Sequence, residues 1–253
     1  MPAERLDKIL SHEGFGSRKS VRRLLRDSLV VINGKPATDP SLLVNAETDS
    51  IEVCGEPLVV RKNIYLMMNK PQDTVSANKD GLHQTFFDLL DEKYRTPYLE
   101  ENLHLAGRLD VDTEGLLLFT TDGKLIHRIT SPKTHSPKSY FVRLEKEVSP
   151  SEMEKIAKDF EAGLEIPPEG KEAGAVLKPA KVEWKNGFEC VLTISEGKFH
   201  QVKRMFLAEN NKVVYLKRLT IGSLTLDSSL ECGSYRELTS EEVEKLVSCI
   251  ETQ

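Results

Sequence analysis

The chain has few of the features that mark metal-binding or disulfide-rich proteins. Its 253 residues include four cysteines, which are separated by long irregular gaps and form no CxxC pair. The six histidines show no HExxH pattern. These spacings do not match a zinc site, so we expect no metal ion, and in a reducing compartment we expect free thiols.

Long apolar runs are also missing. No run approaches the roughly 20 residues that a transmembrane helix needs, and the first residues, MPAERLD, lack the apolar core of a secretory signal. We therefore expect a cytoplasmic protein that does not associate with membranes. A length of 253 residues fits one or two domains.

Positive charge is in deficit over the whole chain, whose formal net charge is -5 at pH 7. Because a generic nucleic-acid-binding domain is expected to be basic, this total argues against that class. The distribution is uneven, however. Residues 1–35 hold eight basic and four acidic residues, 124–146 hold six and one, and 195–220 hold six and two, whereas 227–253 hold two and seven. We expect the three basic stretches to converge on one face.

The first 60 residues predict a small module of two helices and short strands. Apolar side chains recur on one face of residues 4–12, after which a glycine pair interrupts the helix. Ser17 stands where an N-cap belongs, before a helix that extends to about residue 28. Residues 29–33 and 50–53 are strand-like.

The second predicted helix is strongly basic, and it resembles part of an S4 RNA-binding domain. Its basic side chains are Arg18, Lys19, Arg22, Arg23 and Arg26. The resemblance extends to the RLDK segment that begins at Arg5 and to the VVINGK segment at 30–35. It implies that residues 1–60 form such a domain, in which Arg5 and the helix residues bind structured RNA through its phosphates. A solvated helix face is the alternative.

From residue 61 onward, strand-like and helix-like segments follow one another without strict alternation. Apolar or alternating patterns predict strands at 64–68, 116–120, 140–144 and 189–194, and helices at 150–162, at 201–208 and from residue 240. This order favours an α+β fold, with a mainly antiparallel mixed sheet and flanking helices, over a doubly wound one. The Gly- and Pro-rich stretch 163–180 is interpreted as a variable loop.

The densest chemical signal is the segment 104–118, in which a Gly-Arg-Leu-Asp turn leads into an apolar strand. The turn places Asp110 at a strand edge beside Arg108, which can pair with the acid or bind a phosphate. Spacing alone leaves a simple salt bridge in a loop equally open. A sugar hydrolase that uses Asp110 and Asp112 is a further alternative, because residues two apart on a strand share a face.

Two further segments combine basic and aromatic side chains. Lys138 and Tyr140 lie two apart at a strand start, so they point the same way; the lysine can bind a phosphate and the ring can stack on a base. In 194–206 a strand ends at a glycine turn and a basic helix begins, where a lysine could pair with a carboxylate. A half-buried tyrosine and a solvated helix face are the plainer alternatives.

In this order, the three segments resemble the RsuA-type pseudouridine synthase family. The shared motifs are GRLDxxTxGLL at 107–117 and GxxHQVKRMF at 197–206, with MNKP at 68–71. The resemblance implies a catalytic domain over 61–253 that isomerises a uridine of ribosomal RNA to pseudouridine and needs no cofactor. The segments 127–132 and 194–197 look more like the small-subunit (16S) enzymes than the large-subunit (23S) ones.

The resemblance also implies roles for particular residues. Asp110 is then the catalytic aspartate, Tyr140 stacks on the target base, and Lys203 pairs with the aspartate, where other branches have arginine. Arg108 and Ile194 fall at positions that hold the substrate, and Lys138 joins them from the strand argument above.

Asp110 could attack C1′ of the ribose or remove the proton at C2′, and the sequence does not choose between these routes. Both routes need an ionised carboxylate, which a neighbouring Lys203 favours. The implied partner is ribosomal RNA, free or in an assembly intermediate, and we expect a monomer. A large-subunit enzyme of the same family and a non-catalytic S4-domain ribosome-assembly protein are the alternatives.

Overall fold

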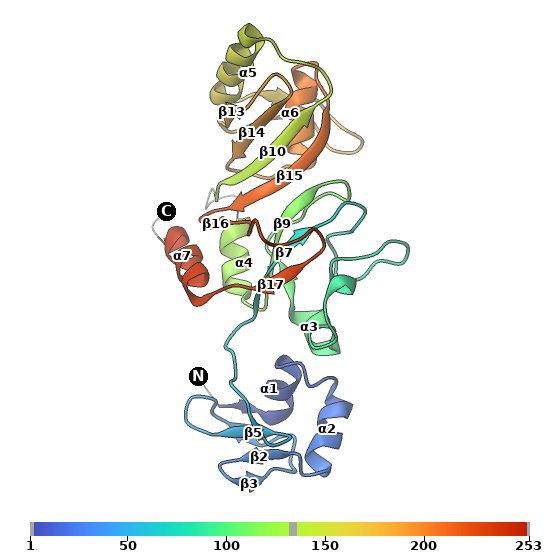
Figure 1. Cartoon of the computed structure of the whole chain (residues 1–253), viewed down its shortest axis with the longest axis vertical. Helices are drawn as coiled ribbons and strands as arrows, with labels where there is room; N and C mark the ends of the chain where they lie inside the picture. The colour runs from blue at the N-terminus through green and yellow to red at the C-terminus, as the bar shows by residue number, and fades with distance from the viewer. Residues whose placement is uncertain (1–2, 132–135, 252–253) are drawn as a thin grey trace.

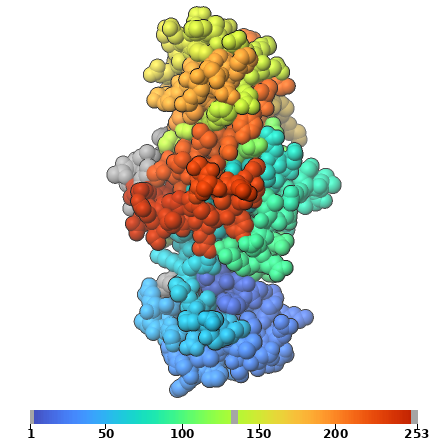
Figure 2. All heavy atoms as spheres, in the orientation of Figure 1, coloured from blue at the N-terminus to red at the C-terminus, as the bar shows by residue number. Residues whose placement is uncertain are grey.

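The computed structural model describes residues 3–131 and 136–251. The molecule is elongated, and its N-terminal module forms one end, seen as the blue lobe in Figures 1 and 2. The fold is α+β with a mainly antiparallel mixed sheet, as predicted. None of the helices within the described ranges is long and apolar enough to cross a membrane. Pro132 of the segment 127–132, and Lys133 of the basic stretch 124–146, lie outside the described residues.

The N-terminal module packs two helices against two small sheets. The helices are α1 (Leu6–His12) and α2 (Arg18–Arg26). One sheet pairs β1 (Glu4–Arg5) with β4 (Leu43–Val44), and the other has the order β3 (Lys35–Pro36), β2 (Val30–Ile32), β5 (Ile51–Val53), β6 (Glu56–Pro57). The first helix begins two residues later than predicted, because this pairing keeps the preceding segment extended.

This module has an apolar core of its own, which includes Leu10, Val21 and Val30. The core of the larger part begins at Ile64. Arg61 lies between them: its Nε donates to Glu13 of the module at 2.8 Å, and its Nη1 donates to Glu237 of the larger part at 2.6 Å. A domain boundary near residue 60 stays a prediction.

The larger part is built on one long sheet (Figure 1). Its order is β13 (Lys181–Trp184), β14 (Glu189–Ile194), β10 (Lys138–Leu144), β15 (Val213–Ile221), β9 (Glu114–Thr120), β7 (Tyr65–Lys70), β17 (Tyr235–Glu237), with β16 (Leu224–Thr225) on β15 and β8 (His104–Leu105) on β9. Neighbouring strands run antiparallel except for β15 and β9, which run parallel.

A glycine allows these two parallel strands to approach. Gly115 of β9 pairs with Arg218 of β15 and has a φ of +101°. A methyl group on Gly115 would overlap the carbonyl oxygen of Arg218 and lie 2.8 Å from its backbone nitrogen. Only glycine fits this conformation and this contact.

Helices cover both faces of the sheet. Successive side chains of β9 point to opposite faces, so β9 contributes to the apolar cluster on each side. Leu117 and Phe119 join a cluster with α5 (Pro150–Ala162) and α6 (Gln201–Ala208). Leu116 and Leu118 join another with α4 (Gly123–Thr130) and α7 (Ser240–Glu251). The short helix α3 (Pro97–Asn102) and the 3-10 turn η1 (Phe87–Leu89) complete the larger part.

The stretch 163–180, which was interpreted as a variable loop, contains a short ordered hairpin; its variability stays a prediction. Strands β11 (Glu165–Ile166) and β12 (Ala175–Val176) pair in antiparallel register. The buried guanidinium of Arg204 on α6 donates to the carbonyls of Pro167 at 2.6 Å and Ala173 at 2.7 Å. The composition of the stretch could not reveal this, because the side chain that fixes it lies on a distant helix.

Candidate active site

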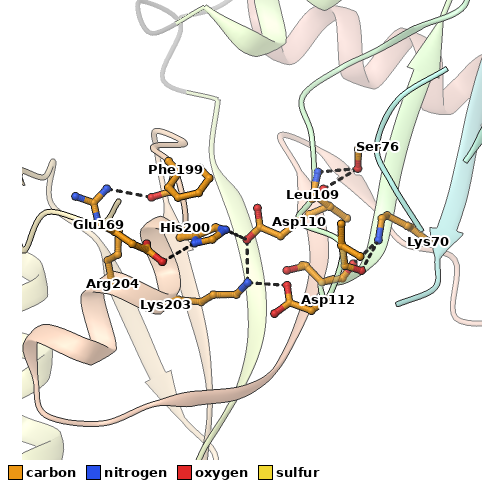
Figure 3. A network of polar contacts seen from close by, with 12 residues as sticks. Lys70, Ser76, Leu109, Asp110, Asp112, Glu169, Phe199, His200, Lys203 and Arg204 are labelled. Carbon is orange, nitrogen blue, oxygen red and sulfur yellow. Dashed lines mark hydrogen bonds and ion pairs between the residues drawn. The ribbon is translucent and has the colours of Figure 1, made fainter. Parts of the chain in front are cut away.

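Asp110 lies in the turn between β8 and β9, and its carboxylate faces α6 (Figure 3). Lys203, in the first turn of α6, donates to Asp110 Oδ2 at 3.0 Å and to Asp112 Oδ1 at 2.6 Å. Although burial alone would lower it, the hydrogen bonds to the two carboxylates raise the pKa of Lys203 above its ordinary value. Lys203 therefore stays charged, and it neutralises part of a site that holds two acids.

Arg108 makes no ion pair with Asp110, and both residues are within the described ranges. Asp110 pairs instead with Lys203, which lies 93 positions further along the chain. Arg108 is exposed at the edge of the pocket that holds Asp110. An exposed guanidinium at this edge can donate hydrogen bonds to a phosphate or to a ribose hydroxyl.

The pocket beside Asp110 lies between the 108–113 turn, the sheet and α6. It is lined by Arg108, Asp110, Tyr140, Ile194, Lys203 and Leu216, among others. Tyr140 is only 8% exposed. The structure therefore brings five of the residues that the sequence singled out to one pocket with a carboxylate, a cation and an aromatic wall. This combination can hold a flat base and present an acid to its sugar.

His200 completes the charged cluster. It begins α6 in a left-handed conformation, with a φ of 47°. Its Nδ1 lies 2.9 Å from Glu169 Oε1, and its Nε2 lies 3.6 Å from Asp110 Oδ2. The ring of Phe199 stacks on that of His200 with centroids 3.7 Å apart. The hairpin at 163–180 thus contributes a carboxylate that orients the imidazole toward Asp110.

Two buried side chains fix the turn that carries Asp110. The Ser76 hydroxyl donates to the carbonyl of Leu109 at 2.7 Å and accepts from its N–H at 3.1 Å. Lys70 is fully buried at the end of β7, and its Nζ donates to the carbonyls of Val111 at 3.2 Å and Thr113 at 2.9 Å (Figure 3). Burial lowers the pKa of Lys70 to about 8, against the attraction of nearby acids.

The remaining predicted residues lie apart from this pocket. Lys138, at the start of β10, lines a neighbouring cavity. The basic residues of α2 are exposed on the N-terminal module, at the other end of the molecule (Figure 1). Arg5 is held by both carboxylate oxygens of Asp7, at 3.0 and 2.9 Å.

Sequence reasoning missed roles for Lys70, Ser76 and Glu169. Lys70 belongs to the MNKP motif, which was a signal without an assigned chemistry. Ser76 and Glu169 have no local signal, because each acts on a segment more than 30 residues away. Within the described residues, no group of three or more His, Cys, Asp or Glu side chains is arranged to hold a metal ion.

Both parts of the chain are similar to known proteins. Residues 64–208 match the family model described as RNA pseudouridylate synthase, and residues 4–50 match the S4 domain. The chain is 47% identical over 248 residues to an uncharacterized RNA pseudouridine synthase of Bacillus subtilis, covering 96% of this chain and 98% of that one. It is 43% identical over 244 residues to ribosomal small subunit pseudouridine synthase A of Haemophilus influenzae, covering 96% and 99%.

A solved structure described as a pseudouridylate synthase is also similar. It superposes with a TM-score of 0.64 at 43% identity, covering 96% of this chain and 99% of that one. A pseudouridylate synthase domain that follows an S4 domain defines an RNA-modifying enzyme. The chain belongs to the RNA pseudouridylate synthase family.

Proposed function

We propose that this protein converts a specific uridine of small-subunit (16S) ribosomal RNA to pseudouridine, with Asp110 as the catalytic residue. The observation that carries the proposal is the 3.0 Å contact between Lys203 Nζ and Asp110 Oδ2, beside Tyr140 in one pocket. Relatives that match nearly the whole chain support the choice of RNA, since several are named ribosomal small subunit pseudouridine synthase A.

The reaction is an isomerisation. The C1′–N1 bond breaks, the uracil turns, and a C1′–C5 bond forms, while C5 loses a proton and N1 gains one. Asp110 acts on the ribose either as a nucleophile at C1′ or as a base at C2′. Lys203 supports both routes, because it holds a positive charge beside the carboxylate. No step needs a metal or an organic cofactor.

The target uridine must leave its stack to reach this pocket, at a cost of a few kcal/mol. Stacking of the uracil on Tyr140 offsets part of that cost. Ile194 packs on the apolar side of the pocket, and Arg108 holds the sugar or phosphate at the edge. The S4 domain, with Arg5 and the basic side chains of α2, binds rRNA elsewhere through phosphates.

The proposal also covers the domains, the oligomeric state, the compartment and the partner of the enzyme. We propose an S4 domain over 1–60 and a catalytic domain over 61–253, acting as a monomer in the cytoplasm. Its partner is ribosomal RNA, free or in an assembly intermediate.

Pseudouridine mapping tests the proposal. Carbodiimide-dependent reverse-transcription stops are compared in 16S and 23S rRNA from cells with and without the gene. We expect one stop in 16S rRNA to vanish with the gene and to return with the wild-type chain. A stop that vanishes from 23S rRNA would establish the large-subunit alternative, and no change in either RNA would leave a non-catalytic assembly role.

A further inference from the structure

A second cavity, of about 370 Å³, adjoins the pocket that holds Asp110 and shares Arg108 and Tyr140 with it. Its walls come from the end of α4, the start of β10, the 195–198 turn and β15. Lys138, Ser136 and Arg218 line it. The catalytic proposal gives Arg218 and Ser136 no role.

Arg218 is a buried cation with an unused donor. It is 1% exposed, its Nε donates to the carbonyl of Leu116 at 2.7 Å, and its Nη1 lies 3.4 Å from the carbonyl of Arg108. Among residues 3–131 and 136–251, its Nη2 has no hydrogen-bond partner, and neither has the buried hydroxyl of Ser136. Buried polar atoms of this kind are normally satisfied, so two of them beside one cavity indicate that something else supplies the acceptor.

Lys138 adds a second cation to the same cavity. Its Nζ donates to the carbonyl of Ser136 at 3.1 Å. Burial, together with the positive charge of Arg218, lowers the pKa of Lys138 to about 8. The lysine and the arginine therefore repel each other across the cavity.

The acid in the cavity wall hydrogen-bonds to other groups. Glu196 also lines the cavity, but its Oε1 accepts from the backbone N–H of Lys178 at 2.8 Å and from the amide of Gln201 at 3.2 Å. Over residues 3–131 and 136–251, no ion pair joins a carboxylate to Lys138 or Arg218. An anion in the cavity would end the repulsion and supply the missing acceptors.

We propose that this cavity binds a phosphodiester group of the substrate RNA, adjacent to the nucleotide whose base enters the Asp110 pocket. The inference rests on the proposed function, because the RNA brings the phosphate to the site. A phosphate has enough acceptor oxygens for Lys138, Arg218 and Ser136 together. The shared wall of Arg108 and Tyr140 keeps it next to the reacting nucleotide, so binding there positions the flipped uridine.

The first test measures how RNA affinity depends on salt. Binding of a 16S rRNA transcript is measured from 50 to 200 mM salt for the wild type, for Lys138→Met and for the control Lys158→Met, which removes an exposed charge on α5. We expect the slope of log K against log salt to fall by about 0.7 to 0.9 in Lys138→Met, the value of one phosphate contact. An unchanged slope, or an equal fall in Lys158→Met, would overturn the proposal.

The second test uses the unaltered protein, so it does not depend on the folding of a variant. Acylation of Lys138 at pH 8 is followed by mass spectrometry alone, with the transcript, and with inorganic phosphate. We expect the transcript to slow the reaction at Lys138 at least tenfold and to leave Lys158 unchanged. Protection by inorganic phosphate but not by the transcript would overturn the proposal in favour of a free phosphate ion.

The same preparations separate this proposal from the catalytic one. Pseudouridine formation is measured with the wild type in each experiment. Wild-type protein that forms no pseudouridine in either rRNA refutes the proposed function. Wild-type protein that forms pseudouridine, while Lys138→Met keeps the full salt slope, refutes only the phosphate site.

Discussion

At the scale of single residues, the active site is defined by which charges are buried and what they contact. Lys203 is paired with two acids, whereas Lys70 is buried against backbone carbonyls. The first lysine balances the charge of Asp110, and the second holds the turn on which Asp110 lies. Opposite pKa shifts express this division, because acids raise the pKa of Lys203 and burial lowers that of Lys70.

The variant Lys70→Met tests the lowered pKa of the buried lysine through the pH dependence of stability. The folded protein holds the pKa of Lys70 at about 8, whereas in the unfolded chain it returns to about 10.5. Between pH 8 and 10 the unfolded chain therefore binds more protons at this position, and the free energy of unfolding rises with pH. We expect wild type to gain up to about 1.4 kcal/mol per pH unit relative to Lys70→Met.

Urea unfolding of both proteins at pH 8, 9 and 10 provides the measurement. The variant is expected to be less stable at every pH, since three carbonyls lose their donor. Only the difference between the two slopes of unfolding free energy against pH reports the titration of Lys70. Parallel stability curves over this range would show that Lys70 keeps its ordinary pKa.

At the scale of elements, local signals located five of the seven α-helices that the structure describes, but fewer than half of its strands. Ser149 and Glu152 form a capping box at the start of α5, and Thr239 and Glu242 form one at the start of α7. Each of these signals spans four residues, so it can be read from the sequence. Strands β1, β4, β11 and β12 were missed because each has only two residues and forms only through its pairing with another segment.

Some residues of the active site could likewise be predicted from the sequence, and others could not. Asp110, Tyr140 and Lys203 belong to motifs, and the sequence resemblance brought them together. Arg218 carried no signal, because its position depends on the parallel pairing of β15 with β9 across about 100 residues. That pairing cannot be read from either segment alone.

Gly115→Ala tests the parallel pairing of β9 and β15. The added methyl group would need a positive φ and would overlap the backbone of Arg218. We expect a loss of about 3 kcal/mol or more in the free energy of unfolding, since backbone strain and overpacking act together. Thermal and urea unfolding measure it.

Gly123→Ala at the start of α4 is the matched control. A methyl group there meets nothing within 4 Å. We expect its stability to match or exceed that of wild type by up to about 1 kcal/mol. Equal stabilities of the two variants would contradict the close approach at Gly115.

At the scale of the whole molecule, the net charge of -5 does not show where the basic side chains lie. Exposed basic side chains lie on α2, at one end of the elongated chain, and the catalytic pocket holds both the paired Lys203 and the exposed Arg108 (Figure 1). The link at Arg61 joins the two parts by ion pairs to Glu13 and Glu237. Whether the basic stretches converge on one face when RNA is bound stays a prediction.

Replacing the exposed arginines of α2 tests the role of the N-terminal module. In a variant with Arg18, Arg22, Arg23 and Arg26 changed to Gln, we expect weaker binding of a 16S rRNA transcript. The salt slope should also be smaller, by about 0.7 to 0.9 for each RNA phosphate that the variant can no longer bind. Stability should stay close to that of wild type, because these side chains are exposed. An unchanged slope would contradict an RNA-binding role for α2.

The role of Asp110 is tested most directly by the single-turnover conversion of uridine in a 16S rRNA transcript by Asp110→Asn. The substitution keeps the shape of the side chain and removes the charge that Lys203 balances. We expect RNA affinity within about twofold of wild type and a rate at least about 10⁴-fold lower, since the group that acts on the ribose is lost. A wild-type rate in this variant, measured on RNA that it binds normally, would contradict the assignment of Asp110.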